Sequence, residues 1–147
     1  MLCTYNQGCF GCCGTEFCKD KQQVIDTIET NTKELKQYKD LNKFRDRKGP
    51  LYPLNEKGVK GLCPNVTKLK NNTYGCILHP KQNKKDYRNN YCYEEYLCPT
   101  QKQYNKWNKA LKAKFIKYLN KLALDPYDYS IQMDNNQLLK NYINNNK

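Results

Sequence analysis

Apolar residues recur at helical spacing between residues 20 and 47. Within this stretch, Asn31-Thr32-Lys33-Glu34 resembles a capping box, in which a polar side chain caps the start of a new helix. We therefore expect two helices, over 20–30 and 32–46, with the turn residues Gly49-Pro50 ending the second.

The clearest helical pattern lies between residues 100 and 123, and it predicts an amphipathic helix over 102–123. Asp125-Pro126 would end this helix, and a shorter one is expected from Asn135 to Ile143. Lysines occupy most of the polar face, while aromatic and aliphatic residues line the other face, namely Tyr104, Trp107, Leu111, Phe115, Tyr118, Leu119 and Leu122.

Two stretches lack such periodicity and contain the cysteines. Residues 1–18 form a knot rich in Cys and Gly, and residues 49–99 are irregular and rich in proline. We expect a single domain over 1–147, a small α-rich fold with irregular, metal-stapled cysteine loops and little or no sheet. The three predicted helices should pack together, with the knot and the irregular region tied over one end.

The amino-acid composition shows why this fold would need cross-links in addition to an apolar core. Leu, Ile, Val and Phe make up 19% of the 147 residues, while the net charge is +12. Values below about 20% with high net charge are typical of disordered chains. Thirteen tyrosines can add packing area, and nine cysteines can add cross-links.

Such cross-links are disulfides or metal bonds, depending on the compartment. The N-terminus has no basic and apolar signal-peptide pattern, no apolar stretch is long enough to span a membrane, and nine is an odd number of cysteines. These features favour a cytoplasmic protein and metal over disulfides. A secreted chain without its signal would look similar, so disulfides remain the alternative.

The cysteines fall into an early and a late group. Cys9-Phe10-Gly11-Cys12 has the Cys-x-x-Cys spacing with which two thiolates bind one ion. The adjacent Cys12 and Cys13 suit a polynuclear cluster or two neighbouring ions, because their side chains diverge. We predict zinc, with a [4Fe–4S] cluster as the alternative. The predicted ligands are Cys3, Cys9, Cys12, Cys13, Cys63, Cys76, Cys92 and Cys98.

This arrangement resembles the YkgJ-like family of zinc- or iron-chelating cysteine-cluster proteins, which has a C-x-x-C-x-x-C-C signature. Cys9, Cys12 and Cys13 resemble the family's knot, with Cys3 in place of its outlying first cysteine. Cys63-Pro64 resembles its C-P element, and Cys76-Ile77-Leu78-His79-Pro80 its C-x-I element, with His79 in place of an arginine. The resemblance covers residues 3–98. It implies metal binding, and for some members a role as the iron–sulfur part of a protein lysine methylase.

Two further residues are open as ligands. His79, the single histidine, follows Cys76 at ligand spacing but also precedes a turn at Pro80, and Cys18 matches the family pattern least. Known catalytic motifs are missing from the sequence, so an enzyme is the minority interpretation.

The basic charge suggests a polyanion partner. Lys106, Lys109 and Lys117 on the 102–123 helix are the predicted RNA contacts, supported by Arg45, Arg47 and Lys48, whereas helical spacing places Trp107 in the core. We expect a metal-binding module of a ribonucleoprotein or other assembly. There are two alternatives. One is an accessory protein that handles metal for an enzyme, and the other is a structural subunit that docks on a larger assembly through its tyrosines. AT-rich coding sequence would also enrich Lys, Asn and Tyr, which leaves open whether the charge is functional.

Overall fold

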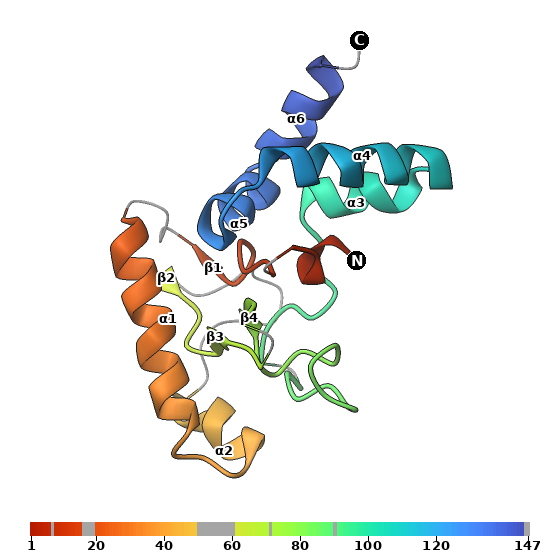
Figure 1. Ribbon diagram of the computed structural model, residues 1–147. Coiled ribbons are helices and arrows are strands. Elements are labelled where there is room, and N and C mark those ends of the chain that lie inside the picture. Colours follow the sequence, from red (N-terminus) through yellow and green to blue (C-terminus); the bar gives the residue numbers. More distant parts are fainter. Residues whose placement is uncertain (7, 16–19, 50–60, 71, 90, 146–147) are drawn as a thin grey trace.

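Helices at two ends of the molecule enclose short strands and loops in the computed structural model (Figure 1). The six α-helices of the described part make this a small α-rich domain. None of them is long and apolar enough to cross a membrane. The structure describes residues 1–6, 8–15, 20–49, 61–70, 72–89 and 91–145.

The N-terminal helical end consists of α1 (Lys21–Leu35) and α2 (Leu41–Asp46). The predicted break near residue 31 is wrong, because α1 continues through it. Asn31 is buried inside the helix, where its amide donates to Val66 O at 3.0 Å. Thr32 accepts a hydrogen bond from Lys68 N at 2.9 Å. These polar residues therefore anchor α1 to a neighbouring strand instead of capping a new helix.

The other end consists of α3 (Pro99–Lys106), α4 (Lys109–Leu122), α5 (Pro126–Asp134) and α6 (Gln137–Asn144). The helix predicted over 102–123 is thus divided at Trp107, which is extended, and Asn108, whose side chain caps α4. Helix α4 ends at Leu122 with Ala123 in the left-handed conformation, whereas Asp125 caps α5 and Pro126 occupies its first turn, so the Asp-Pro pair starts a helix instead of ending one. Helix α6 confirms the short C-terminal helix.

Two antiparallel ribbons lie between these ends. Strand β1 (Gly14–Thr15) pairs with β2 (Gly61–Leu62), and β3 (Val66–Lys68) pairs with β4 (Tyr74–Cys76). A 3-10 turn, η1 (Leu2–Thr4), begins the chain. The strands are only two or three residues long, in agreement with the expectation of little sheet.

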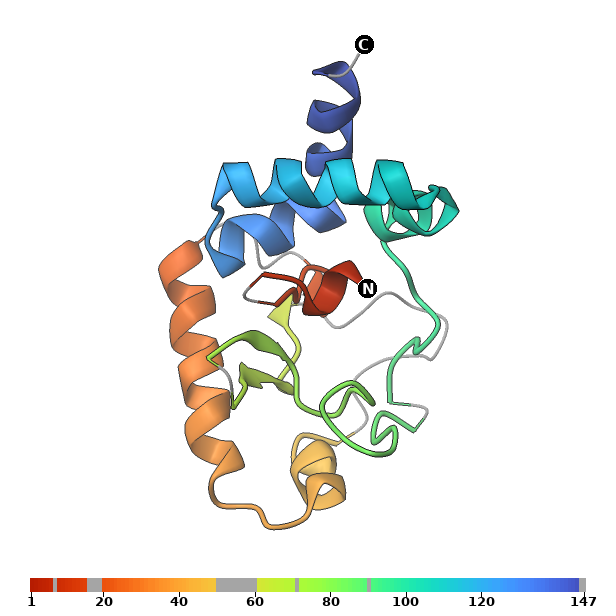
Figure 2. The same ribbon diagram turned by 45° about the vertical axis from the view of Figure 1, so that its right-hand side comes forward.

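The core consists of two apolar clusters. One lies among α3–α6 and the N-terminus and includes Leu2, Phe115 and Met133, and the other lies under α1 and includes Phe10 and Ile28. Helix α5 contacts both clusters. The predicted packing of α1 and α2 against α4 is wrong, because the cysteine-bearing segments lie between the two helical ends instead of over one end (Figure 2).

Candidate metal centre

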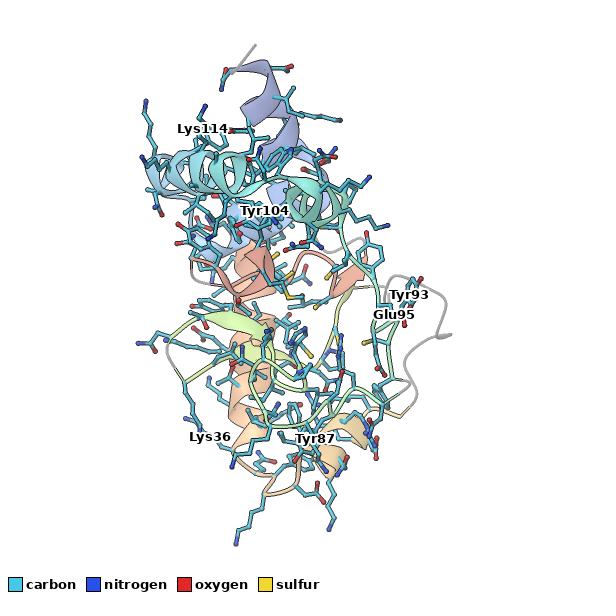
Figure 3. All side chains as sticks on the ribbon, turned by 90° about the vertical axis from the view of Figure 1, so that its right-hand side faces the viewer. Lys36, Tyr87, Tyr93, Glu95, Tyr104 and Lys114 are labelled. Carbon is cyan, nitrogen blue, oxygen red and sulfur yellow. The ribbon has the colours of Figure 1, made fainter. Side chains whose placement is uncertain are left out.

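A cavity of about 160 Å³ lies between the two helical ends. Side-chain sulfur atoms gather in this middle region of the molecule (Figure 3). All eight cysteines of the described residues are free thiols, and Cys18 lies outside those residues. Seven of the eight predicted ligands line the cavity, namely Cys3, Cys9, Cys12, Cys13, Cys63, Cys76 and Cys92.

The N-terminal knot folds back on itself before β1. Cys9 N–H donates to Cys3 O at 3.0 Å, and Cys13 N–H donates to Phe10 O at 2.9 Å. Phe10 N–H also donates to the buried Ser130 hydroxyl of α5, at 3.0 Å. The knot is therefore held against α5 by a hydrogen bond from its main chain to a side-chain hydroxyl.

Gly11 lies at the closest approach between the knot and α5. A Cβ atom at this position would lie 2.1 Å from Ser130 O and 2.8 Å from Asp134 Cβ. No real contact is this short, so only glycine fits unless the backbone shifts. Glycine at this position of the knot thus permits its close packing against α5.

The ribbons bring three cysteines from distant parts of the sequence together. Strand β1 pairs Gly14 with Leu62, and Cys63 N–H donates to Cys13 O at 2.8 Å. In the second ribbon, Cys76 is paired with Val66. The register of these short strands therefore places Cys13, Cys63 and Cys76 around one side of the cavity.

Cys98 reaches the knot from the start of α3. It is the N-cap of this helix, and its sulfur accepts from Gln101 N–H at 3.5 Å. The side chain of Gln101 accepts in turn from Leu2 N–H at 2.7 Å, next to Cys3. Cys98 is only 6% exposed and shares an apolar cluster with Leu2 and Cys9.

All three arginines of the chain hold segments that carry cysteines. Arg47 donates to Pro64 O at 2.6 Å, beside Cys63. Arg88 donates to Glu94 O at 3.0 Å, and Arg45 packs over the Tyr91 ring, on either side of Cys92. This role was not predicted from the sequence. The chain has only three arginines beside 23 lysines, and an arginine retained in such a composition indicates a site that needs a planar donor.

The environment of the thiols opposes their ionisation. Burial, followed by the charges of Cys12 and Cys98, raises the pKa of Cys3 to about 12. Burial also raises the pKa of Cys63 to about 11 and that of Cys76 further above the ordinary value. Thiolates crowded in this way need a cation, and a bound metal would replace the protons.

The thiols are close to one another but do not converge on a point. Among the residues that the structure describes, no group of three or more Cys, His, Asp or Glu side chains lies in an arrangement that could hold an ion. A cysteine has a single side-chain torsion to its sulfur, and rotation between staggered wells moves the sulfur without moving the backbone. The structure therefore brings the predicted ligands close together without arranging them around a single point.

His79 also lines the cavity, but its ring is partly committed. Its Nδ1 accepts from Lys81 N–H at 3.1 Å, within the turn at Pro80 that the sequence predicted. Burial lowers the pKa of this imidazole, and the charge of Arg88 lowers it further. A neutral ring with Nδ1 accepting presents its other nitrogen as a donor. This arrangement fits a turn residue better than a ligand.

The predicted RNA contacts lie on α3 and α4 and do not line the cavity. Lys106, Lys109 and Lys117 are all exposed, and Lys114 of the same helix projects outward at that end of the molecule (Figure 3). Trp107 packs against Phe115, with ring centroids 5.3 Å apart, which confirms its expected place in the core. Arg45 and Arg47 are mostly buried in intramolecular contacts, with side chains 14% and 5% exposed, so little of either guanidinium is open to a phosphate, and their role in RNA binding stays a prediction.

Comparison with known proteins does not extend this description: no family model, curated protein or solved structure matches the chain at a significant level. The likeness to the YkgJ-like family thus remains a resemblance of cysteine spacing.

Proposed function

We propose that this chain is a metal-binding protein whose cysteine thiolates hold zinc or an iron–sulfur cluster as the centre of the fold. The observation that supports it is the gathering, from distant segments, of eight free cysteines between two helical ends. Nothing in ordinary core packing requires so many small thiols in one place. Buried free cysteines account for one or two such residues, not for seven around a shared cavity with an eighth, Cys98, at the start of α3.

Zinc is the first candidate because four thiolates at tetrahedral geometry form its commonest structural site. A [4Fe–4S] cluster also takes four thiolates and tolerates irregular spacing. Either group would supply the positive charge that crowded thiolates need, and the residues that would hold it are those lining the cavity together with Cys98.

Elemental analysis of protein purified without oxygen tests the proposal. We expect zinc, or iron with acid-labile sulfide, in at least stoichiometric amount, and loss of that metal when Cys63 is replaced by serine. Replacement of the exposed Lys36 by glutamine is the matched control. A pure, reduced and folded protein without metal would contradict the proposal.

As a binding module, the folded domain would contact RNA or a ribonucleoprotein assembly through the basic face of α3 and α4. From residue 96 to 124 the sequence contains seven lysines and no acidic residue. In the described residues, no ion pair involves these lysines, and most of them are exposed. Uncompensated charge on a helix whose other face is packed is what an electrostatic phosphate contact requires.

The alternative is an accessory protein that carries an iron–sulfur cluster for an enzyme such as a protein methylase. It rests on the cysteine spacing alone. Iron content and a brown colour would favour it, whereas zinc and salt-sensitive RNA binding would favour the binding module.

A further inference from the structure

We propose that the eight cysteines form two neighbouring centres of four thiolates each. Cys3, Cys9, Cys12 and Cys98 make the first centre. Cys13, Cys63, Cys76 and Cys92 make the second. This division rests on the metal-binding function proposed above and specifies its ligand sets.

The first set gathers on the side of α3–α6. Cys98 and Cys9 belong to the same apolar cluster, which also contains Leu2, and Cys9 is hydrogen-bonded to Cys3. Cys12 and Cys98 are the thiols that act on Cys3, and Cys12, Cys3 and Cys98 are those that act on Cys9. The shared apolar cluster and the Cys9–Cys3 hydrogen bond therefore hold three members of this set together, and Cys12 follows Cys9 at Cys-x-x-Cys spacing.

The second set gathers on the side of α1 and the ribbons. Cys13 and Cys63 belong to the apolar cluster that contains Val66, and β4 places Cys76 opposite Val66. Cys63 and Cys92 are the thiols that act on Cys76, and Cys92 acts on Cys63. The apolar cluster and the strand register therefore bring Cys13, Cys63 and Cys76 together, and Cys92 lines the same cavity.

The division passes between two adjacent residues. Cys12 acts on Cys3 and Cys9, while Cys13 is influenced first by Cys12 and then by Cys76 and Cys63 of the second set. The Cys12 and Cys13 thiols are themselves hydrogen-bonded, and one cavity touches members of both sets. The centres would therefore lie side by side and share the peptide that joins these two residues.

Charge differs between the two centres. Four thiolates around a divalent ion leave a net charge of about −2. At the second centre, Arg47 donates to Pro64 O beside Cys63, and Arg88 lines the cavity. At the first, the positive group nearby is the N-terminus at Met1, which also lines the cavity. Two arginines therefore offset part of the thiolate charge at the second centre.

Reconstitution of the full reduced chain with Co²⁺ in the absence of oxygen tests the division. Two ions per chain are expected, with the visible bands of tetrahedral cobalt and thiolate charge transfer. A pair of changes within the first set, Cys3→Ser with Cys98→Ser, should remove one ion. A pair within the second set, Cys63→Ser with Cys92→Ser, should remove the other.

The cross-set pair Cys98→Ser with Cys63→Ser is the control, because both residues are similarly buried, at 6% and 7% exposure. It leaves three thiolates in each centre and should weaken both ions. Equal cobalt loss from all three variants would overturn the division in favour of one shared cluster.

Substitution of the wild-type chain with ¹¹³Cd²⁺ avoids any dependence on variant folding. Two NMR signals of equal intensity, each at the shift of four-sulfur coordination, would support two centres. A single signal or a polynuclear coupling pattern linking more than two ions would overturn them while preserving metal binding. A reduced chain that takes up neither cobalt nor cadmium would instead overturn the proposed function itself.

Discussion

Arg47 links α2 to the segment that carries Cys63. Its side chain is only 5% exposed and donates to Glu34 Oε2 at 2.8 Å, Phe44 O at 2.8 Å and Pro64 O at 2.6 Å. A planar guanidinium can satisfy these separate acceptors at once, whereas a lysine ammonium cannot reach all of them.

We expect Arg47→Lys to lower the unfolding free energy of the metal-loaded protein by about 2–4 kcal/mol, because buried acceptors lose their donors. Urea denaturation followed by circular dichroism measures this. Lys48→Gln is the control, because Lys48 is 50% exposed and makes only a solvent-exposed ion pair with the same carboxylate, with its Nζ 3.4 Å from Glu34 Oε1. Its cost should stay within about 0.5 kcal/mol. Equal costs for the two changes would show that the buried contacts of Arg47 are not what stabilises this region.

The partner of Arg47 gives a pH dependence. The hydrogen bond from Arg47 lowers the pKa of the Glu34 carboxyl below its usual value of 4.5. A carboxyl whose pKa is lowered by folding adds stability above its unfolded pKa, and this stability is lost as the pH falls through the folded value. As the pH falls below 4.5, the wild-type protein should therefore lose the stability that the ionised Glu34 contributes. The Glu34→Gln variant lacks this contribution at every pH.

The measurement is the difference in urea midpoint between wild type and Glu34→Gln from pH 7 to pH 3. Acid also releases metal, but it does so in both proteins, so the difference isolates Glu34. A difference that stays constant over this range would contradict the lowered pKa.

A substitution at Gly11 tests whether the close approach of the knot to α5 is required. Gly11→Ala should destabilise the protein by roughly 1–3 kcal/mol and reduce metal content, because the new methyl group meets backbone that cannot yield. Gly49→Ala is the comparison: its φ is +70°, but open space surrounds it. Its cost should be about 1–2 kcal/mol from backbone strain, with full metal content. Normal metal binding in Gly11→Ala would show that the knot tolerates displacement from α5.

At the scale of elements, helical periodicity located the helices but not their boundaries. Asn31 and Asn108 are both asparagines within helical patterns, yet one is buried inside α1 and the other caps α4. The difference is tertiary: Asn31 finds an acceptor in β3, which lies 35 residues away in sequence. A local pattern cannot contain that partner, so boundaries set by such contacts escape prediction.

The candidate site shows the same limit. Composition and spacing predict eight cysteines as ligands, and the structure brings these cysteines around one region. The division proposed for them depends on the pairing of Gly14 with Leu62 and of Val66 with Cys76. Strands of two or three residues have almost no sequence signal, so the proposed sets could not be derived from the sequence.

The basic face of α3 and α4 yields a prediction about salt. Each phosphate contact releases counterions, so log K falls with log salt by about 0.7–0.9 per contact. Changing Lys106, Lys109 and Lys117 to glutamine should flatten this slope by up to about three units for an RNA ligand. Fluorescence anisotropy at several salt concentrations measures it, and metal content should not change.

A triple change of Lys36, Lys39 and Lys43 to glutamine provides the control, since these lysines are also exposed and lie at the opposite helical end. It removes the same charge and should leave the slope nearly unchanged. Equal slopes for the two variants would mean that the charge acts non-specifically, and docking on a protein partner would then explain the basic face better.

At the scale of the whole molecule, neither apolar cluster is large. The N-terminal one consists of a few residues beneath α1, and the C-terminal one depends on aromatic contacts among α3, α4 and α6. Apart from α5, the two are joined through the cysteine-bearing segments. Structural zinc can contribute about 10–16 kcal/mol, comparable to the roughly 5–15 kcal/mol stability of a small domain. Metal at the cysteines would therefore decide whether this chain folds.

We accordingly expect a chelator, under reducing conditions and at neutral pH, to abolish both the helical circular dichroism and the buried environment of Trp107. Trp107 reports on the C-terminal cluster, whereas circular dichroism also includes α1 and α2, so the two signals together show whether one end survives alone. Adding zinc back should restore both signals, which separates reversible unfolding from aggregation. If the stripped, reduced chain instead keeps a cooperative urea transition, the apolar clusters alone suffice for folding, and the cysteines must be retained for the chemistry of the metal.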